Sequence, residues 1–263
     1  MSYIYKDHTF AVCAYKESEY LEELLESLRK QTIETNIIIA TSTPNEHIRT
    51  LAEKYELPVF VNNGEKGIAA DWNFAVRCAQ TTLVTIAHQD DIYEPSYAEK
   101  ILGAMNTAER PIIAFSRYAE LRNGEKVYKN RLLNIKRILL IPMRLSRNSV
   151  FLRRRSLSMG NAICCPAVTY VRDLILESPF NTDFSCDLDW AQWEKLSKLE
   201  GSFLYIDEPL MCHRIHQESE TSAMIGTSKR AEEDYQMFCK FWPKPIAAFI
   251  EKFYASSEQS NDL

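Results

Sequence analysis

Short apolar runs alternate with amphipathic segments along the first half of the chain. Runs rich in β-branched residues predict buried strands, and apolar residues three and four positions apart predict helices with one buried face. The predicted strands are 9–14, 36–40, 59–61, a run that starts at Leu83, and 111–116. The predicted helices are a segment capped by Ser18 with leucines at 21, 24, 25 and 28, and the ranges 47–55, 69–79 and 96–106. This alternation is typical of an α/β fold with a mainly parallel sheet flanked by helices.

The pattern changes after residue 116. The dipeptide Asn123-Gly124 is a strong signal for a hairpin turn. The later predicted elements are a strand-like run at 162–170, a helix from Asp187 to Leu199, a strand at 203–206, and a helical segment at 235–253 interrupted at Pro243 and Pro245. We therefore expect one α/β domain over residues 1–225 and a C-terminal helical extension over 226–263, with a polar, frayed tail from Ser256.

Two adjacent carboxylates, Asp90 and Asp91, end the apolar run that starts at Leu83. Open α/β sheets bind ligands at the carboxyl ends of their strands. Two anionic groups there predict a hard divalent cation with oxygen ligands, although surface aspartates that cap the next helix would give the same pattern. Because neighbouring residues of an extended chain point in opposite directions, one carboxylate on the ion is favoured over both.

Composition narrows the functional classes. The chain has 263 residues, 46% of them hydrophobic and 25% charged, which is ordinary for a globular protein. Its net charge of −5 disfavours nucleic acid as a partner. Seven cysteines without a Cys-x-x-Cys pair disfavour zinc and dithiol chemistry. With no segment typical of a signal peptide or a bilayer span, we expect a cytoplasmic protein.

Four segments, in this order, resemble those of the inverting family 2 glycosyltransferases, which have the GT-A fold. They are the strand and loop 11–17 with the leucine-rich helix after it, the segment 67–73, the motif 88–91, and the acidic motif 189–193. The resemblance runs from about Thr9 to about Ser222. It implies a Rossmann-like, mixed but mainly parallel sheet, and transfer of a sugar from a nucleoside diphosphate to an acceptor hydroxyl with inversion.

The resemblance also implies roles for individual residues. Asp90 would hold Mn²⁺ or Mg²⁺, and His216 would be a further ligand, although a polar residue at a strand end explains His216 equally well. Asp189 would be the general base, with Asp187 as second candidate; helix-start acids are the alternative for both. The expected donor-binding residues are Ala14, Tyr15, Glu17, Thr41, Gly67, Asn73, Gln89, Asp91 and Arg214.

Three positions depart from the pattern of the family. Thr41 begins a Thr-Ser-Thr-Pro loop where the family often has an aspartate that contacts the nucleotide base, His88 stands where the first aspartate of the metal motif is common, and Trp72 replaces an arginine. We expect a UDP-linked donor, but these positions keep two alternatives open. One is a catalytically weakened sugar-nucleotide-binding protein. The other is a nucleotidyltransferase on a related fold, which the scarcity of glycine disfavours.

The segment 131–155 is strongly basic. Its eight cations are Arg131, Lys136, Arg137, Arg144, Arg147, Arg153, Arg154 and Arg155, and it has no acidic residue. It is consistent with a solvated loop, with a clamp for the donor diphosphate, or with peripheral contact at the inner face of a membrane through the apolar residues 138–141. A mixture of the last two is favoured, and the acceptor is expected to be a glycan or a lipid-linked saccharide.

Overall fold

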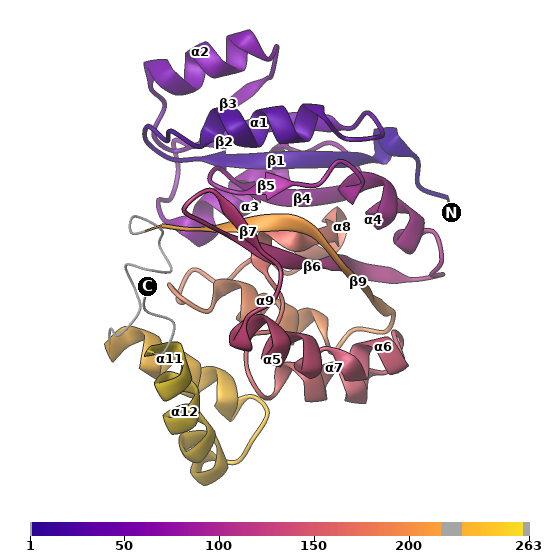
Figure 1. The fold of residues 1–263 in the computed structure, drawn as a ribbon, viewed down its shortest axis with the longest axis vertical. Helices are drawn as coiled ribbons and strands as arrows, with labels where there is room; N and C mark the ends of the chain where they lie inside the picture. Colours follow the sequence, from indigo (N-terminus) through magenta and orange to yellow (C-terminus); the bar gives the residue numbers. More distant parts are fainter. Residues whose placement is uncertain (1, 217–227, 260–263) are drawn as a thin grey trace.

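A mixed sheet forms the centre of the computed structural model, which describes residues 2–216 and 228–259. Among these residues the strand order is β3-β2-β1-β4-β8-β6-β9-β5, with β7 paired to β6 (Figure 1). The strands are β1 (His8–Ala14), β2 (Asn36–Thr41), β3 (Val59–Val61), β4 (Leu83–His88), β5 (Ile92–Tyr93), β6 (Pro111–Arg122), β7 (Glu125–Val127), β8 (Val168–Val171) and β9 (Ser202–Ile215). Strand β1 pairs in parallel with β2 and β4, and β8 runs antiparallel between β4 and β6.

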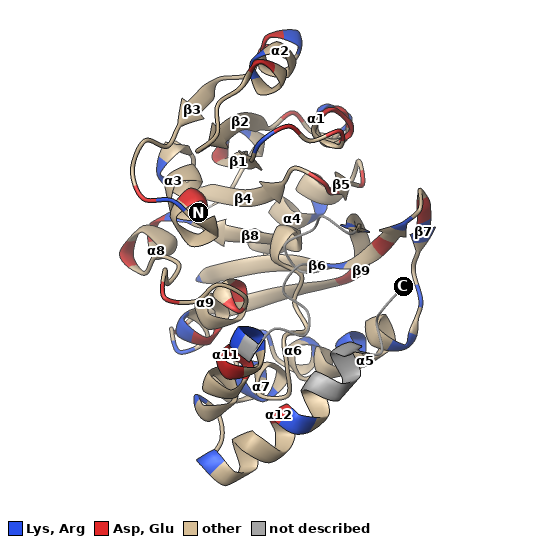
Figure 2. Cartoon of the chain, turned by 90° about the vertical axis from the view of Figure 1, so that its left-hand side faces the viewer, with Lys and Arg blue, Asp and Glu red and all other residues tan. Residues whose placement is uncertain are grey.

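Helices cover both faces of the sheet. They are α1 (Leu21–Arg29), α2 (Glu46–Lys54), α3 (Ile68–Cys78), α4 (Tyr97–Met105), α5 (Arg131–Leu139), α6 (Ile141–Leu145), α7 (Val150–Leu157), α8 (Arg172–Glu177), α9 (Leu188–Leu196), α11 (Ser228–Cys239) and α12 (Lys244–Gln259). Alternate side chains of β1 enter different cores: Phe10 and Val12 pack with α1 and α4, and Ala11 packs on the side of α3 and α9. Figure 2 shows that β1, β2, β4 and β8 carry no charged residue, as two-sided burial requires.

The predicted α/β architecture and the first-half elements are confirmed, but several boundaries are wrong. Helix α1 starts at Leu21, because the Ser18 hydroxyl accepts from the Tyr20 N–H (3.3 Å) in the turn before the helix. Only the last three residues of the run 162–170 lie in a strand, which is β8 (Val168–Val171). Pro166 lies in a 3₁₀ turn just before it, where its missing N–H costs no ladder hydrogen bond.

The second half of the chain holds more regular structure than the pattern predicts. Strand β9 extends nine residues beyond the predicted end at Ile206. The basic segment is not a solvated loop, because it forms α5, α6 and α7; the Asn130 and Ser149 side chains cap α5 and α7. The hairpin turn is confirmed, since Asn123 and Gly124 both have positive φ.

The C-terminal helices pack against α9. The Phe238 ring meets the Trp190 ring edge-on at 5.1 Å. Glu233 accepts hydrogen bonds from the backbone N–H groups of Ser185 (2.9 Å) and Cys186 (2.7 Å), just before α9. The predicted break is confirmed at Pro243, between α11 and α12, but Pro245 lies in the first turn of α12 and does not interrupt it. Helix α12 continues through Gln259, past the predicted end at Phe253 and into the predicted frayed tail. No helix of the described ranges combines the length and apolarity needed to cross a bilayer.

Arg153 holds α7 to the end of α9. Its side chain is fully buried and donates to the carbonyl oxygens of Ser197 (2.9 Å), Gly201 (2.7 Å) and Leu199. The substitution Arg153→Met is expected to lower the free energy of unfolding by about 3 kcal/mol, because it leaves buried carbonyls without donors. Urea unfolding measures this, with the exposed Arg131→Met as control; a loss below about 0.5 kcal/mol would contradict the assignment.

Candidate active site

The loop after β4 and the end of β9 lie side by side at one edge of the sheet. Strand β5 pairs antiparallel with β9, with Ile92 opposite Cys212. This register brings the residues just before β5 next to the last residues of β9. The two segments are 123 residues apart in sequence at Asp91 and Arg214, yet they share a hydrogen bond. In Figure 1, β9 crosses the lower part of the sheet to reach this edge.

Asp90 and Asp91 are each bound by a histidine. His213 Nδ1 donates to Asp91 Oδ1 (2.9 Å), which also accepts from the Arg214 N–H (3.0 Å). His216 Nε2 lies 2.9 Å from Asp90 Oδ2. Burial opposes ionisation of Asp90, but His216, His213 and His88 outweigh burial and lower its pKa to about 2. Asp90 is therefore ionised at neutral pH.

Arg214 ties this loop to α1. Its Nε donates to the Asp90 backbone oxygen (2.8 Å), and its guanidinium also bonds Glu23 and lies 4.2 Å from the centre of the Tyr20 ring. Arg214 is one of the predicted donor-binding residues. The structure places it at the site, where it fixes the backbone of Asp90.

The side chains of His88, Asp90 and Asp91 converge as metal ligands should. One ligand atom from each lies within 4.8 Å of the others. Within the described part of the chain, His88 Nε2 and Asp91 Oδ2 are buried without a hydrogen-bond partner. Burial lowers the pKa of His88, so its imidazole is neutral and able to bind a metal. These orphaned atoms and this donor set fit a divalent cation.

The geometry of this motif differs from two expectations. The argument from an extended chain favours one carboxylate on the ion, but the chain turns here: the Asp91 N–H donates to the His88 oxygen (3.3 Å) and both carboxylates converge. The converging group also contains His88, which the sequence suggests only as a departure from the family pattern. His216, the predicted further ligand, bonds the Asp90 carboxylate, and its role as a ligand stays a prediction.

Asp189 lies in the first turn of α9. Its Oδ1 accepts from Asn161 Nδ2 (3.0 Å) and from the Trp190 N–H (2.6 Å). Burial raises its pKa to about 6, against the lowering effect of these bonds and of Lys136. A carboxylate poised near neutrality suits a general base.

Asp187 has a different environment. It is buried, and burial together with the nearby Asp234 of α11 raises its pKa well above the ordinary value. These effects make Asp187 harder to ionise, and its neighbour Asp234 repels the negative charge that a base must carry. The structure therefore favours Asp189 between the two predicted candidates.

The two acidic centres lie in one region of the molecule. Burial raises the pKa of the Cys164 thiol, and the charges of both Asp91 and Asp189 raise it further. Lys136, from α5, acts on Asp189 and donates to the Tyr118 hydroxyl (3.0 Å), whose ring lies 6.2 Å from His213. The sequence did not predict Lys136 or His213 as site residues, because neither belongs to a motif.

The loops after β1 and β4 are joined by Gln89. Its side chain accepts from the Tyr15 N–H (2.8 Å) and donates to the Tyr15 oxygen (3.1 Å). Ala14 is buried at the end of β1, and Glu17 is exposed in the following loop. These predicted donor contacts therefore lie beside the metal motif. What they bind stays a prediction.

The remaining predicted donor contacts lie around α3. Gly67 has φ 113° at the start of this helix, where a side chain would be strained. Thr41 is buried, and its hydroxyl accepts from the Thr43 N–H (3.0 Å). The Asn73 amide exchanges two hydrogen bonds with the backbone of Phe180 (2.9 and 3.0 Å), which gives Asn73 a packing role as well.

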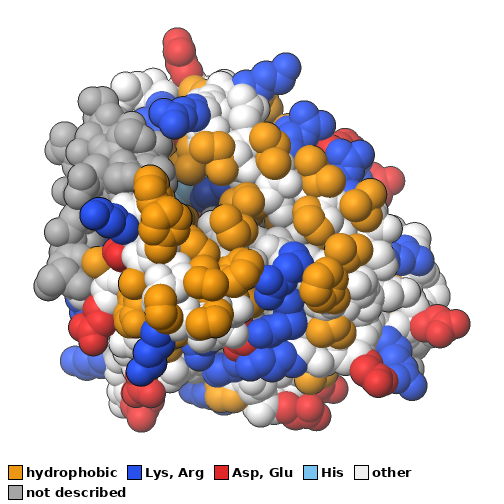
Figure 3. All heavy atoms as spheres, turned by 90° about the horizontal axis from the view of Figure 1, so that it is seen from below, with side chains coloured by type: hydrophobic (Ala, Val, Ile, Leu, Met, Phe, Trp, Pro, Cys, Tyr) orange, Lys and Arg blue, Asp and Glu red, His pale blue; other side chains and the backbone are white. Residues whose placement is uncertain are grey.

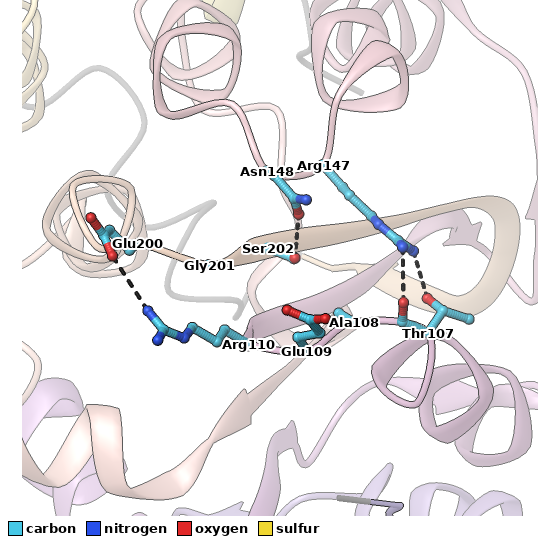
Figure 4. A pocket seen from close by; sticks show the side chains of 9 residues that line it. All are labelled: Thr107, Ala108, Glu109, Arg110, Arg147, Asn148, Glu200, Gly201 and Ser202. Atoms are coloured by element: carbon cyan, nitrogen blue, oxygen red, sulfur yellow. Dashed lines mark hydrogen bonds and ion pairs between the residues drawn. The ribbon is translucent and has the colours of Figure 1, made fainter.

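A separate hollow lies where strands β6 and β9 begin (Figure 4). Strand β9 reaches the loop of Asp90 and Asp91 only at its other end. Its lining residues are Thr107, Ala108, Glu109, Arg110, Arg147, Asn148, Glu200, Gly201 and Ser202. Arg147 donates to Thr107, and Arg110 pairs with Glu200 (3.4 Å). The hollow contains none of the predicted site residues.

Solved structures with this fold include sugar-nucleotide complexes. The chain is similar to the mannosyltransferase PcManGT from Pyrobaculum calidifontis in complex with GDP-Man and Mn²⁺ (TM-score 0.66, 15% identity, covering 96% of this chain and 70% of that one). It is also similar to S. aureus TarS 1-349 in complex with UDP-GlcNAc (TM-score 0.63, 15% identity, covering 94% and 70%). The predicted GT-A fold is confirmed.

Similar sequences are described as glycosyltransferases. An uncharacterized glycosyltransferase of Haemophilus influenzae is 24% identical over 226 residues, which cover 78% of this chain and 64% of that protein. The uncharacterized glycosyltransferase YwdF of Bacillus subtilis is 31% identical over 104 residues, which cover 38% of this chain and 39% of that protein. The chain thus spans less than two thirds of either relative. The model of Glycosyl transferase family 2 matches residues 9–178, more than half of the chain, and the protein belongs to that family.

Proposed function

We propose that the protein transfers a sugar, with inversion, from a UDP-linked donor to a hydroxyl of a glycan or lipid-linked saccharide. One observation carries the proposal: two acidic centres with opposite electrostatic character lie in one region. The pKa of Asp90 is lowered to about 2, and that of Asp189 is raised to about 6. When two carboxylates have such different pKa values, the one with the low pKa suits binding of a positive charge. The one with the raised pKa suits acceptance of a proton.

His88, Asp90 and Asp91 would hold Mn²⁺ or Mg²⁺ at this site. The bound ion supplies positive charge that stabilises the departing diphosphate. His213 and His216 orient the two carboxylates, and Arg214 fixes the Asp90 backbone. Hydrogen bonds from neighbouring residues to the ligands orient the ligand side chains toward the metal.

Asp189 would take the proton of the acceptor hydroxyl. Asn161 bonds Asp189 Oδ1, which holds the carboxylate in place. For direct displacement, the base must activate an acceptor on the face of the sugar opposite the leaving group. The placement of Asp189 on α9, apart from the β4 loop that carries Asp90, supports that arrangement.

The donor would lie against the loops that leave β1, β2 and β4. Gln89 joins two of these loops through Tyr15, and Ser42 in the third donates to Asp71 of α3 (2.7 Å). The complexes of similar structures with UDP-GlcNAc and with GDP-Man and Mn²⁺ support a nucleotide sugar as donor.

A thermal-shift panel of nucleoside diphosphate sugars, with and without Mn²⁺, tests the proposal. A donor at a hundred times its Kd adds about 2.7 kcal/mol of stability. For a chain of this size, we expect the Tm to rise by about 5–10 °C with a UDP-sugar and Mn²⁺ together. Donor hydrolysis then separates an enzyme from a binding protein. No shift with any of the donors would contradict the proposal, and a shift with nucleoside triphosphates alone would favour a nucleotidyltransferase.

A further inference from the structure

The face of the molecule built by α5, α6, α7 and α12 is unusually apolar for a surface. Figure 3 views the molecule from this side and shows hydrophobic side chains in close groups with Lys and Arg among them. The exposed fractions are 62% for Ile138, 75% for Leu145, 69% for Phe151 and 65% for Phe249. Scattered single apolar residues need no explanation, but a grouped set of large ones marks an interaction surface.

The helices of this face bury other apolar residues against the rest of the molecule. Leu133, Met143 and Leu157 of the three short helices, and Leu140 between α5 and α6, are buried in the molecule. Helices α5 to α7 therefore have apolar residues on the inner and the outer side. On α12, the Phe249 and Phe253 rings contact each other (centroids 4.9 Å apart), while Ala247 is buried.

Helix α7 and the residues just after it contact α12 and the residue Trp242 just before α12. The Arg155 guanidinium lies 4.8 Å from the centre of the Trp242 ring, and the Trp242 indole N–H donates to the Ser158 oxygen (2.7 Å). A Cβ on Gly160 would lie 2.6 Å from the Tyr254 ring, so the backbone after α7 meets α12 closely. The two groups of exposed apolar side chains thus belong to one surface.

The charge of this surface is positive. No acidic residue lies between Arg131 and Arg155. Arg137 and Arg144 share a single carboxylate, Asp207, which also pairs with Arg117, so cations remain in excess. Arg131, Lys244 and Lys252 add exposed residues of the same sign. A second copy docked symmetrically here would place like charges against each other, whereas an anionic lipid surface complements them.

We propose that this face docks on an anionic lipid bilayer. Ile138, Leu145, Phe151 and Phe249 would enter the boundary between head groups and acyl chains, as interfacial helices do. The arginines and lysines around them would lie at the level of the lipid phosphates. This surface extends the basic segment 131–155 with α12, which the sequence pattern did not join to it.

Helix α5 connects the docking face with the active site. Its outer side carries Ile135 and Ile138, and its Lys136 bonds Tyr118 and acts on Asp189. Docking would therefore bring the part of the site that contains Asp189, the proposed general base, close to the bilayer. It follows, on the basis of the proposed glycosyl transfer, that the acceptor belongs to the lipid-linked class.

Co-sedimentation of the full chain with vesicles tests the docking face. Phosphatidylcholine vesicles with phosphatidylglycerol should bind the protein at low salt, and pure phosphatidylcholine vesicles should bind it weakly. The triple variant Leu145→Gln, Phe151→Gln, Phe249→Gln should bind about tenfold or more weakly, since each large side chain loses its apolar contact with lipid. The control is Ile4→Gln, another exposed apolar residue outside the face, which should bind as the wild type does.

Each outcome of the vesicle assay decides the question. No binding to anionic vesicles at low salt, or equal binding by wild type and triple variant, would overturn the proposal. A triple variant that loses a dimer seen by light scattering and keeps vesicle binding would assign the face to self-association instead. Because the assay contains no sugar nucleotide, its result is independent of whether the proposed transfer occurs.

Discussion

The substitution Asp90→Asn is expected to lower sugar transfer by at least about a hundredfold, because it removes a charge on which cation binding depends. Asparagine has the shape of aspartate and an oxygen that still accepts from His216, so the loop should keep its fold. The donor should bind the variant with little or no dependence on Mn²⁺. Transfer assays and calorimetric titration of the donor, each with and without Mn²⁺, measure the two effects.

A surface aspartate provides the matched control for this variant. Asp173, at the start of α8, is exposed and forms a long ion pair with Arg172 (3.9 Å). The substitution Asp173→Asn removes the same charge and should leave transfer and metal dependence unchanged. If Asp90→Asn retained wild-type transfer and metal dependence, Asp90 could not be a ligand of the cation.

The first half of the fold is predictable because each element there satisfies one simple pattern. Strands β1, β2 and β4 are buried on both faces, so they appear in the sequence as continuous apolar runs. The leucines of α1 fall on a single face, and that face is the buried one. Local pattern and tertiary burial agree in these elements, which makes the parallel α/β core evident from sequence alone.

The second half is less predictable because its elements depend on distant partners. The end of β9 extends past Ile206 since it pairs along β6 and with β5, and a period-two pattern is weak in that stretch. The helices of the basic segment have apolar residues on two sides, so no single buried stripe indicates them. The run 162–170 has the apolar composition of a strand, but the chain forms a 3₁₀ turn at Pro166.

The candidate site shows the same division between motif and tertiary structure. The sequence predicts Asp90, Asp91 and Asp189 as site residues by motif, since each follows a predictable element boundary. The participation of His88 becomes visible only in the structure. A turn, and not an extended strand, brings its ring close to the carboxylates of Asp90 and Asp91. His213 and Lys136 come from elements far away in sequence. The choice between Asp187 and Asp189 needs burial and neighbours, which no spacing reports.

The substitution Asp189→Asn is expected to lower kcat by about a hundredfold to ten-thousandfold with little change in donor affinity, because general-base catalysis contributes about that much. Asparagine can still accept from the Trp190 N–H but cannot take a proton. Transfer kinetics at saturating donor, together with donor titration, separate the two effects. If Asp187→Asn abolished transfer and Asp189→Asn did not, the roles assigned to the two acids would be reversed.

The pH profile of the wild type gives a second, independent measure of the same base. Asp189 acts only when it is deprotonated, and burial raises its pKa to about 6. The transfer rate should therefore be near its plateau above that value and fall as the pH drops through about 6, by about tenfold per unit well below it. The residual rate of Asp189→Asn should lack this inflection. A wild-type profile that stays flat from pH 7 to pH 5 would mean that another group accepts the proton, because no carboxylate with a pKa of about 6 could remain a working base there.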